Sequence, residues 1–327
     1  MVAVTADAIR DAVPRIPAVF RNMPQFVSEP LRERLGVPVV VKAETANPIG
    51  CFKGRGTWLA VSELAASGEV GEGRGLVVAS AGNFGQGVAY AARALGIGLV
   101  VFAAETANPA KVAAMRRLGA EVRLVGEDYD AAGTAADAYV AESGWRRLTD
   151  GVDPWTTIGA GTMAVELTAG VEAGDLPALT ALFVPVGDGA LIGGIGTWLR
   201  AAAPQVRVIG VQPAAAPAVT LSWRAGRPIE TDRADTVADG LAAKAPLPEA
   251  LAVMASVVDE MVLVEERAIL DAQAELSAVL PFTVEPSAAV GWAAMRDAPA
   301  HAGAIGFILT GGNVPPPEDG RQPPVTV

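Results

Sequence analysis

Short apolar runs, many of them β-branched, alternate along the chain with longer, alanine-rich amphipathic stretches. The apolar runs predict strands at Val39–Val41, Leu76–Ala79, Leu99–Ala103, Val122–Val125, Leu182–Val186, Val206–Val211 and Ile305–Leu309. The amphipathic stretches predict helices at Thr57–Ala66, Phe84–Leu95, Pro109–Leu118, Ala131–Glu142, Thr162–Ala169, Gly193–Ala202 and Glu265–Val279. Strands that are apolar throughout are buried on both faces, which is typical of parallel sheets covered by helices. We therefore predict an α/β fold.

The predicted elements form two groups, which indicates two sheets rather than one. Strand and helix units follow each other closely from Gly75 to about Arg147, as in a small lobe inserted into a larger one. We expect a small α/β domain at residues 75–149 and a large domain made of residues 1–74 and 150–327. Residues 314–327 contain five prolines and no apolar periodicity. We expect this tail to be extended or disordered, with no regulatory domain after the main unit.

Composition and charge exclude several classes of protein. The 327 residues include one cysteine, Cys51, and one histidine, His301, so an internal disulfide and a multi-cysteine or multi-histidine metal centre are impossible. The net charge of −11 opposes a nucleic-acid surface. Residues 1–21 lack an uninterrupted apolar segment, and no stretch of about 20 residues is apolar enough to span a membrane. We expect a cytoplasmic protein without nucleic-acid or membrane partners.

Four glycine-rich turns follow predicted strands, the place where open α/β sheets bind their ligands. The first turn, from Asn47 to Gly56, has Lys53 where a helix should begin. Helix N-termini disfavour cations, so Lys53 is unusual as a structural residue. Desolvation near a positive helix end lowers the pKa of an amine, as an imine-forming lysine requires. The alternative is a solvated surface lysine.

The other three turns are weaker signals when taken one by one. Residues 80–86 read Ser-Ala-Gly-Asn-Phe-Gly-Gln, whose backbone N–H groups could bind an anion, or whose Ser80 or Asn83 could simply cap a helix. Residues 187–194 form a glycine-rich loop between the predicted strand at Leu182–Val186 and the helix that follows. The loop matches neither the Walker motif nor Gly-x-Gly-x-x-Gly. Residues 309–313 read Leu-Thr-Gly-Gly-Asn. None of these turns decides the function alone.

Together and in this order, the turns resemble the motifs of fold-type II enzymes that use pyridoxal 5′-phosphate (PLP), in the threonine dehydratase and serine racemase branch. Residues 50–56 are similar to that family's Gly-Ser-Phe-Lys-x-Arg-Gly, and residues 80–86 to its Ser-Ser-Gly-Asn-His-x-Gln. Residues 187–191 resemble its tetraglycine phosphate loop, and residues 310–313 its Ser-Gly-Gly-Asn. The resemblance implies a two-lobed α/β fold, each lobe an open, mostly parallel sheet flanked by helices.

The resemblance also implies roles for individual residues. Lys53 would be catalytic, forming the Schiff base with PLP and moving the Cα proton. Cofactor-binding residues would be Phe52, Lys53, Asn83, Gly187, Asp188, Gly189, Ala190, Leu191, Gly240 and Thr310. Substrate-binding residues would be Ser80, Ala81, Gly82, Asn83, Gln86 and Asp239. A hydroxyl from Thr310 at the pyridine nitrogen would leave that nitrogen largely unprotonated, which favours elimination over transamination.

Several residues depart from the family pattern. Cys51 and Phe84 replace a serine and a histidine, and both change the substrate pocket. Asp188 and Ala190 replace two glycines of the phosphate loop, so the Asp188 carboxylate must turn away from the phosphate or weaken its binding. Ala81 stands where racemases of this branch carry a proton-donating serine. Residues 212–218, which match the branch's metal site, contain no carboxylate, so we expect no metal there.

These motifs favour a PLP-dependent ammonia-lyase. It would remove the β-hydroxyl of a small hydroxy amino acid, of the serine or threonine type, and release a 2-oxo acid and ammonia. We expect a homodimer. One alternative is a β- or γ-replacement enzyme of the threonine synthase or cysteine synthase kind, which the Asn47-Pro48-x-Gly50 wording favours. Another is a PLP-binding protein without turnover.

Overall fold

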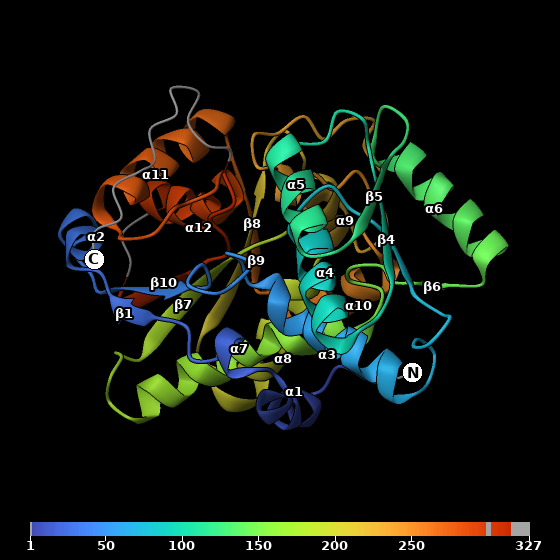
Figure 1. The fold of residues 1–327 in the computed structure, drawn as a ribbon. Coiled ribbons are helices and arrows are strands. Elements are labelled where there is room, and N and C mark those ends of the chain that lie inside the picture. The colour runs from blue at the N-terminus through green and yellow to red at the C-terminus, as the bar shows by residue number, and fades with distance from the viewer. Residues whose placement is uncertain (1, 299–301, 315–327) are drawn as a thin grey trace.

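Two separate sheets organise the computed structural model, which describes residues 2–298 and 302–314 (Figure 1). The predicted Pro-rich tail beyond Val314 and the single histidine, His301, lie outside these residues. The helices are α1 (Ala6–Ala12), α2 (Glu29–Leu35), α3 (Lys53–Ala66), α4 (Asn83–Leu95), α5 (Pro109–Arg117), α6 (Tyr129–Ser143), α7 (Pro154–Glu172), α8 (Ala190–Ala202), α9 (Ala218–Ala225), α10 (Pro248–Val257), α11 (Glu266–Val279) and α12 (Pro286–Asp297).

The larger sheet has six strands, and all neighbours are parallel except the first pair, β1 and β2. In spatial order the strands are β1 (Gln25–Val27), β2 (Val39–Ala43), β10 (Ala304–Leu309), β7 (Leu179–Pro185), β8 (Arg207–Pro213) and β9 (Glu260–Val264). The last strand of the chain, β10, therefore lies between β2 and β7. This insertion brings the turns that follow these three strands to one edge of the sheet.

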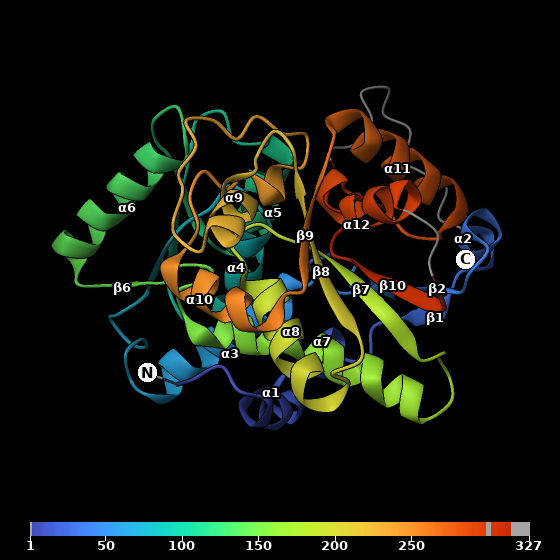
Figure 2. The same cartoon turned by 180° about the vertical axis from the view of Figure 1, so that it is seen from behind.

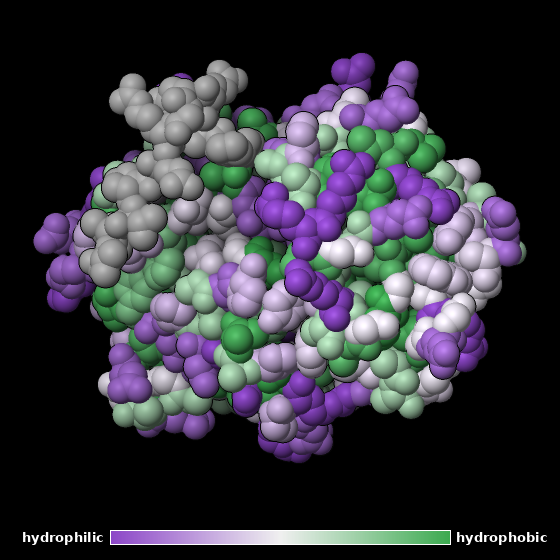
Figure 3. Space-filling model, in the orientation of Figure 1, coloured by the Kyte–Doolittle hydropathy of each residue, from purple (hydrophilic) through white to green (hydrophobic). Residues whose placement is uncertain are grey.

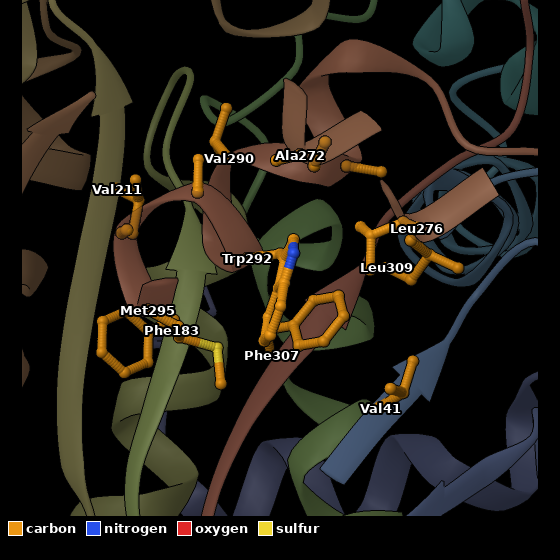
Figure 4. Close-up of a cluster of buried hydrophobic side chains, with 14 of the residues drawn as sticks. Val41, Phe183, Val211, Ala272, Leu276, Val290, Trp292, Met295, Phe307 and Leu309 are labelled. Carbon is orange, nitrogen blue, oxygen red and sulfur yellow. The ribbon is translucent and has the colours of Figure 1, made fainter. Parts of the chain in front are cut away.

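Helices cover both faces of the six-stranded sheet, as its apolar strands require. Along β2, Val39 and Val41 face the cluster formed with α11 and α12, whereas Val40 faces α7 and α8. Figures 1 and 2 show these two pairs of helices on opposite sides of the sheet. Trp292 and Phe307 occupy the centre of the first cluster (Figure 4), and both are fully buried.

The smaller sheet has four parallel strands within residues 76–147. Their order is β5 (Glu121–Leu124), β4 (Leu99–Ala103), β3 (Leu76–Ala79) and β6 (Arg146–Arg147). One face packs on α3, α4 and α5, and the other packs on α6. The α/β fold with parallel sheets flanked by helices is thus confirmed, while the division into domains at residues 75–149 stays a prediction.

Most predicted elements occur within a few residues of their expected bounds, and two helices are longer than expected. Helix α3 begins at Lys53 instead of Thr57, and α7 begins at Pro154 instead of Thr162. Both extra segments contain glycines, which are poor helix formers, so local propensity placed the starts too late. Packing supplies the missing stability: a Cβ on Gly56 would lie 2.5 Å from the Thr156 carbonyl oxygen, so α3 and α7 approach closely there.

The pattern missed several elements altogether. Among the helices and strands, these are α1, β1, α2, β6, α9, α10, β9 and α12. Polar residues interrupt the apolar periodicity in most of them, as in β9, whose first residue, Glu260, is exposed. The surface mixes hydrophilic and hydrophobic residues over the face seen in Figure 3. None of the helices in the described part of the chain combines the length and the apolar run that a membrane crossing needs.

Candidate active site

Lys53 is the first residue of α3, and its loop is anchored to the turn that follows β10. The Phe52 N–H donates to the Thr310 carbonyl oxygen at 2.9 Å, and the Gly312 N–H donates to the Gly50 carbonyl oxygen at 2.9 Å. The Asn47 amide closes the loop from within, donating to the carbonyl oxygens of Glu44 and Cys51. These bonds hold Lys53 at the carboxyl edge of the six-stranded sheet.

Two carboxylates face the Lys53 ammonium. Its Nζ lies 2.5 Å from Oδ2 of Asp150 and 3.5 Å from Oδ2 of Asp188, and 4.7 Å from the centre of the Phe52 ring. Burial by itself lowers the pKa of Lys53, but the attraction of the two carboxylates outweighs it and leaves this pKa raised. In this geometry Lys53 is a charged partner of two acids and not yet a free amine.

Asp188 lies in the loop that opens α8. Its Oδ1 accepts a hydrogen bond from the Ala190 N–H at 2.8 Å, and Gly189 adopts a left-handed φ of 98° between them. Burial raises the pKa of Asp188, but the Lys53 charge and the Ala190 N–H outweigh burial, so this pKa is lowered. Asp188 thus places a negative charge at the N-terminus of α8, where backbone N–H groups and the helix dipole favour an anion.

The sequence analysis did not identify Asp150. It lies in the turn between β6 and α7, and its Oδ1 is buried without a hydrogen-bond partner. Burial, followed by the charge of Asp188, raises the pKa of Asp150 to about 7. An acidic residue a few positions before a helix is common in any sequence, so only the contact with Lys53 identifies Asp150.

A second polar cluster joins Asn83, Glu285 and Asn313. Asn83 Nδ2 donates to Glu285 Oε1 at 2.8 Å, and Asn313 Nδ2 donates to Asn83 Oδ1 at 2.8 Å. Glu285 also accepts the Asn313 N–H at 3.3 Å. Burial raises the pKa of Glu285 to about 7, although Lys111 opposes this effect. Glu285 and Asn313 orient Asn83, and neither was assigned a role from the sequence.

The turn at residues 80–86 is built around the Ser80 hydroxyl. Ser80 Oγ accepts the N–H groups of Gly82 at 3.3 Å and Gly85 at 3.1 Å. The N-cap residue of α4 is Gly82, so neither Ser80 nor Asn83 holds that position. The Ser80 hydroxyl nevertheless satisfies the Gly85 N–H in the first turn of α4. Ala81 is half-buried in the same turn, and Gln86 is buried.

Three further predicted residues lie at the border of the site. Gly240 packs against the phosphate loop, since a Cβ on Gly187 would lie 2.9 Å from its carbonyl oxygen. Leu191 is buried in the first turn of α8. Asp239 forms an ion pair with Lys111 of α5, and its side chain is 61% exposed. The Asp239 carboxylate therefore lies beside the Lys111 ammonium, which is carried by a helix that packs against the smaller sheet.

A buried ionic network supports the base of α3. The Arg55 guanidinium donates to the carboxylate of Glu44 and to that of Glu166. Lys42 Nζ lies 2.5 Å from Glu166 Oε2. Lys42, Glu44 and Arg55 are at most 1% exposed. These charges compensate one another, as burial requires. They also fix the helix that carries Lys53, because Arg55 is part of its first turn.

The residues at this edge fit a phosphorylated aldehyde cofactor. A cavity of about 10 Å³, lined among others by Phe52, Lys53, Thr57 and Asp150, lies beside the lysine. The Ala190 N–H at the start of α8 already donates to the Asp188 carboxylate, so it can donate to another anion in its place. The Cys51 thiol is buried, which raises its pKa and keeps it protonated, so it does not compete with the Lys53 amine as a nucleophile.

Comparisons with known proteins agree with this geometry. The family described as "Pyridoxal-phosphate dependent enzyme" matches residues 18–311. An L-threonine ammonia-lyase from Geobacter sulfurreducens is 36% identical over 94% of this chain and 75% of its own length. The processed form of threonine deaminase isoform 2 from Solanum lycopersicum has a TM-score of 0.84 at 31% identity, covering 94% of this chain and 85% of its own. Maize serine racemase has a TM-score of 0.88 at 28% identity, and the match covers 96% of this chain and 95% of the racemase chain.

Proposed function

Since the chain belongs to the pyridoxal-phosphate dependent enzyme family and is a PLP-dependent lyase, we propose that it is an ammonia-lyase for L-threonine or L-serine. The observation that carries the proposal is the placement of Lys53. Lys53 begins α3 at the edge of the six-stranded sheet. Its ammonium contacts Asp150 and also Asp188, which lies in the loop that begins α8. The similarity to a threonine ammonia-lyase over 94% of the chain supports the substrate class.

PLP, when bound, supplies an electron sink that acidifies the Cα proton of an amino acid. We propose that the Lys53 amine holds the cofactor and then takes the Cα proton. The loop amides at residues 187–191 would bind the phosphate, and the Thr310 hydroxyl would hold the pyridine nitrogen. Asn83, oriented by Glu285 and Asn313, donates to the cofactor's ring hydroxyl. The Asn83 and Phe84 N–H groups at the start of α4 would bind the substrate carboxylate, because the N–H groups of Ser80, Gly82, Gly85 and Gln86 already donate to protein acceptors.

Elimination also needs a proton for the departing β-hydroxyl. Asp150 has a pKa of about 7 and touches Lys53, so it can exchange a proton with the lysine near neutral pH. The Asn47 side chain gives no separate support to β- or γ-replacement. Its three hydrogen bonds close the loop before Lys53, which explains the Asn47-Pro48-x-Gly50 wording without a second substrate.

The test is a spectral and product assay on the purified protein. We expect imine absorbance in the resting protein, a spectral change with L-threonine or L-serine, and equal amounts of 2-oxo acid and ammonia. Product formation only after adding a thiol or another nucleophile would indicate a replacement enzyme. Imine absorbance with no response to any amino acid would indicate a binding protein. The expected homodimer and cytoplasmic location stay predictions, and light scattering tests the first.

A further inference from the structure

We propose that Asp188 is a built-in anion that occupies the phosphate position of the cofactor-free protein and competes with PLP for it. This inference rests on the proposed function, because it takes the loop at residues 187–191 as the phosphate site. It concerns how readily the site accepts its cofactor. The substrate and the reaction do not depend on it.

The first observation is that one carboxylate engages both groups that the cofactor needs. Asp188 Oδ1 accepts the Ala190 N–H at 2.8 Å, which is a phosphate donor of the loop. Asp188 Oδ2 lies 3.5 Å from Lys53 Nζ, the amine that must attack the aldehyde. A glycine at this position would remove this acceptor of the Ala190 N–H and would leave Lys53 with Asp150 as its carboxylate partner. Asp188 thus ties the anion-binding loop to the reactive lysine.

The second observation is the charge balance around Lys53. With Lys53 protonated, one ammonium faces the carboxylates of Asp150 and Asp188. Cofactor loading would bring a phosphate dianion, and condensation of Lys53 with the aldehyde would consume the ammonium and release water and a proton, so the carboxylates would lose the free ammonium as their partner. Like charges at such short range repel strongly in a partly buried site. Asp188 must therefore rotate away, and Asp150 must hold a proton, before the phosphate binds well.

The third observation is the room beside the lysine. The cavity next to Lys53 measures about 10 Å³, roughly one water molecule. Lys53 and Asp150 line it, and Asp188 contacts the Lys53 ammonium. An internal carboxylate that satisfies the loop gives the cofactor-free protein a stability that a bare loop would lack. The same contact then weakens cofactor binding, because it has to be broken first.

The proposal predicts opposite effects on two measurements. Cofactor-free Asp188→Gly, prepared by hydroxylamine treatment and dialysis, should melt at a lower temperature than cofactor-free wild type. Its dissociation constant for PLP, read from imine absorbance, should fall by about 10-fold or more, the scale of a charge-assisted hydrogen bond. Asp188→Asn keeps an acceptor for the Ala190 N–H but removes the charge. It should also bind PLP more tightly, with a smaller loss of melting temperature.

Inorganic phosphate provides a readout that does not involve Lys53 chemistry. Added phosphate should raise the melting temperature of cofactor-free Asp188→Gly more than that of wild type, because a ligand that binds more tightly stabilises the folded state more. Asp128→Asn is the matched control. Asp128 also accepts a hydrogen bond at a helix start, from the Ala131 N–H at 3.0 Å, and caps α6. This variant should change melting temperature without changing the PLP or phosphate response.

The outcomes separate this inference from the proposed function. Equal or weaker PLP binding in both Asp188 variants would overturn the inference, while imine formation at Lys53 would still support the proposed site. An unchanged phosphate response in Asp188→Gly would also overturn it. PLP that attaches to a different lysine would instead contradict the proposed site itself.

Discussion

Arg55 and Glu166 form a two-pronged ion pair inside the protein, with Nη1 2.7 Å from Oε1 and Nη2 2.9 Å from Oε2. Arg55 lies two residues after Lys53 on α3, and Glu166 lies on α7. Glu44 and Lys42 complete this network. The pair therefore couples the helix of the reactive lysine to the helix that packs beneath it.

Removal of Arg55 should strongly destabilise the protein. Arg55→Met leaves the carboxylates of Glu44 and Glu166 buried with one ammonium, and we expect a loss of about 3–5 kcal/mol in the free energy of unfolding. Urea denaturation measures it. The exposed pair between Arg32 and Glu29 is the control, and Arg32→Met should cost much less. Equal losses of unfolding free energy in the two variants would show that the buried ion pairs stabilise the protein no more than an exposed pair does.

Lys53→Ala should abolish both imine absorbance and turnover while the protein stays folded. The lysine side chain contacts Asp150 and Asp188 only at its charged end, so its truncation leaves the α3 packing intact. Absorbance spectra, product assays and circular dichroism check the three parts. Lys244→Ala, at an exposed ion pair, is the control and should keep full absorbance. PLP attached to Lys42, Lys111 or Lys244 would refute the assignment.

Glu285 should make the cofactor-free protein less stable as pH rises from about 4.5 to 7. Burial raises its pKa to about 7, so the folded state keeps a proton that the unfolded state releases, and stability falls across that window. The contribution is about 3 kcal/mol, because the pKa differs by roughly 2.5 between the folded and unfolded states and each pKa unit corresponds to about 1.36 kcal/mol. Urea denaturation between pH 4.5 and 8 measures it. In Glu285→Gln this part of the pH dependence should vanish, whereas in the exposed Glu72→Gln it should persist.

Ala81 should suppress racemisation. Inversion at Cα needs a proton donor on each face, and the methyl group of Ala81 can neither give nor take a proton. A well-placed acid or base contributes about 10²–10⁴-fold, so formation of the opposite enantiomer should be slower than elimination by a similar factor. Chiral chromatography of the wild-type reaction measures both products. D-amino acid formed as fast as 2-oxo acid contradicts this prediction.

Chelators should leave activity unchanged, as should added magnesium or calcium. In the segment expected to lack a metal, Gln212 Oε1 accepts the N–H and the hydroxyl of Thr220 and so helps to start α9. The side-chain oxygen of Gln212 is therefore occupied by two hydrogen bonds from Thr220. Turnover measured with and without a chelator tests the prediction. A several-fold loss on chelation, restored by a divalent cation, would reveal a site elsewhere in the protein.

The sequence alone determined the fold class and predicted Lys53 as the reactive residue. Continuous apolar strands between amphipathic helices have only one common solution, a parallel sheet covered on both faces, and that solution is observed. The turns with Lys53, Ser80 and Asp188 were found because each directly follows a strand, and strand ends are visible locally. Helix α5 likewise begins at Pro109 as predicted, with Asn108 as its N-cap, because the start of a helix depends on adjacent residues.

Only the tertiary structure decided which polar groups meet. Asn83 and Glu285 are separated by 202 residues, and Arg55 and Glu166 by 111. Asp150 meets Lys53 because α3 and α7 pack through Gly56. The insertion of β10 between β2 and β7 brings Thr310 and Asn313 beside the lysine loop. Such contacts depend on strand order and helix packing, which arise from the whole chain and leave no local pattern. The raised pKa values of Asp150 and Glu285 follow from those contacts, because burial and neighbouring charge exist only once the chain has folded.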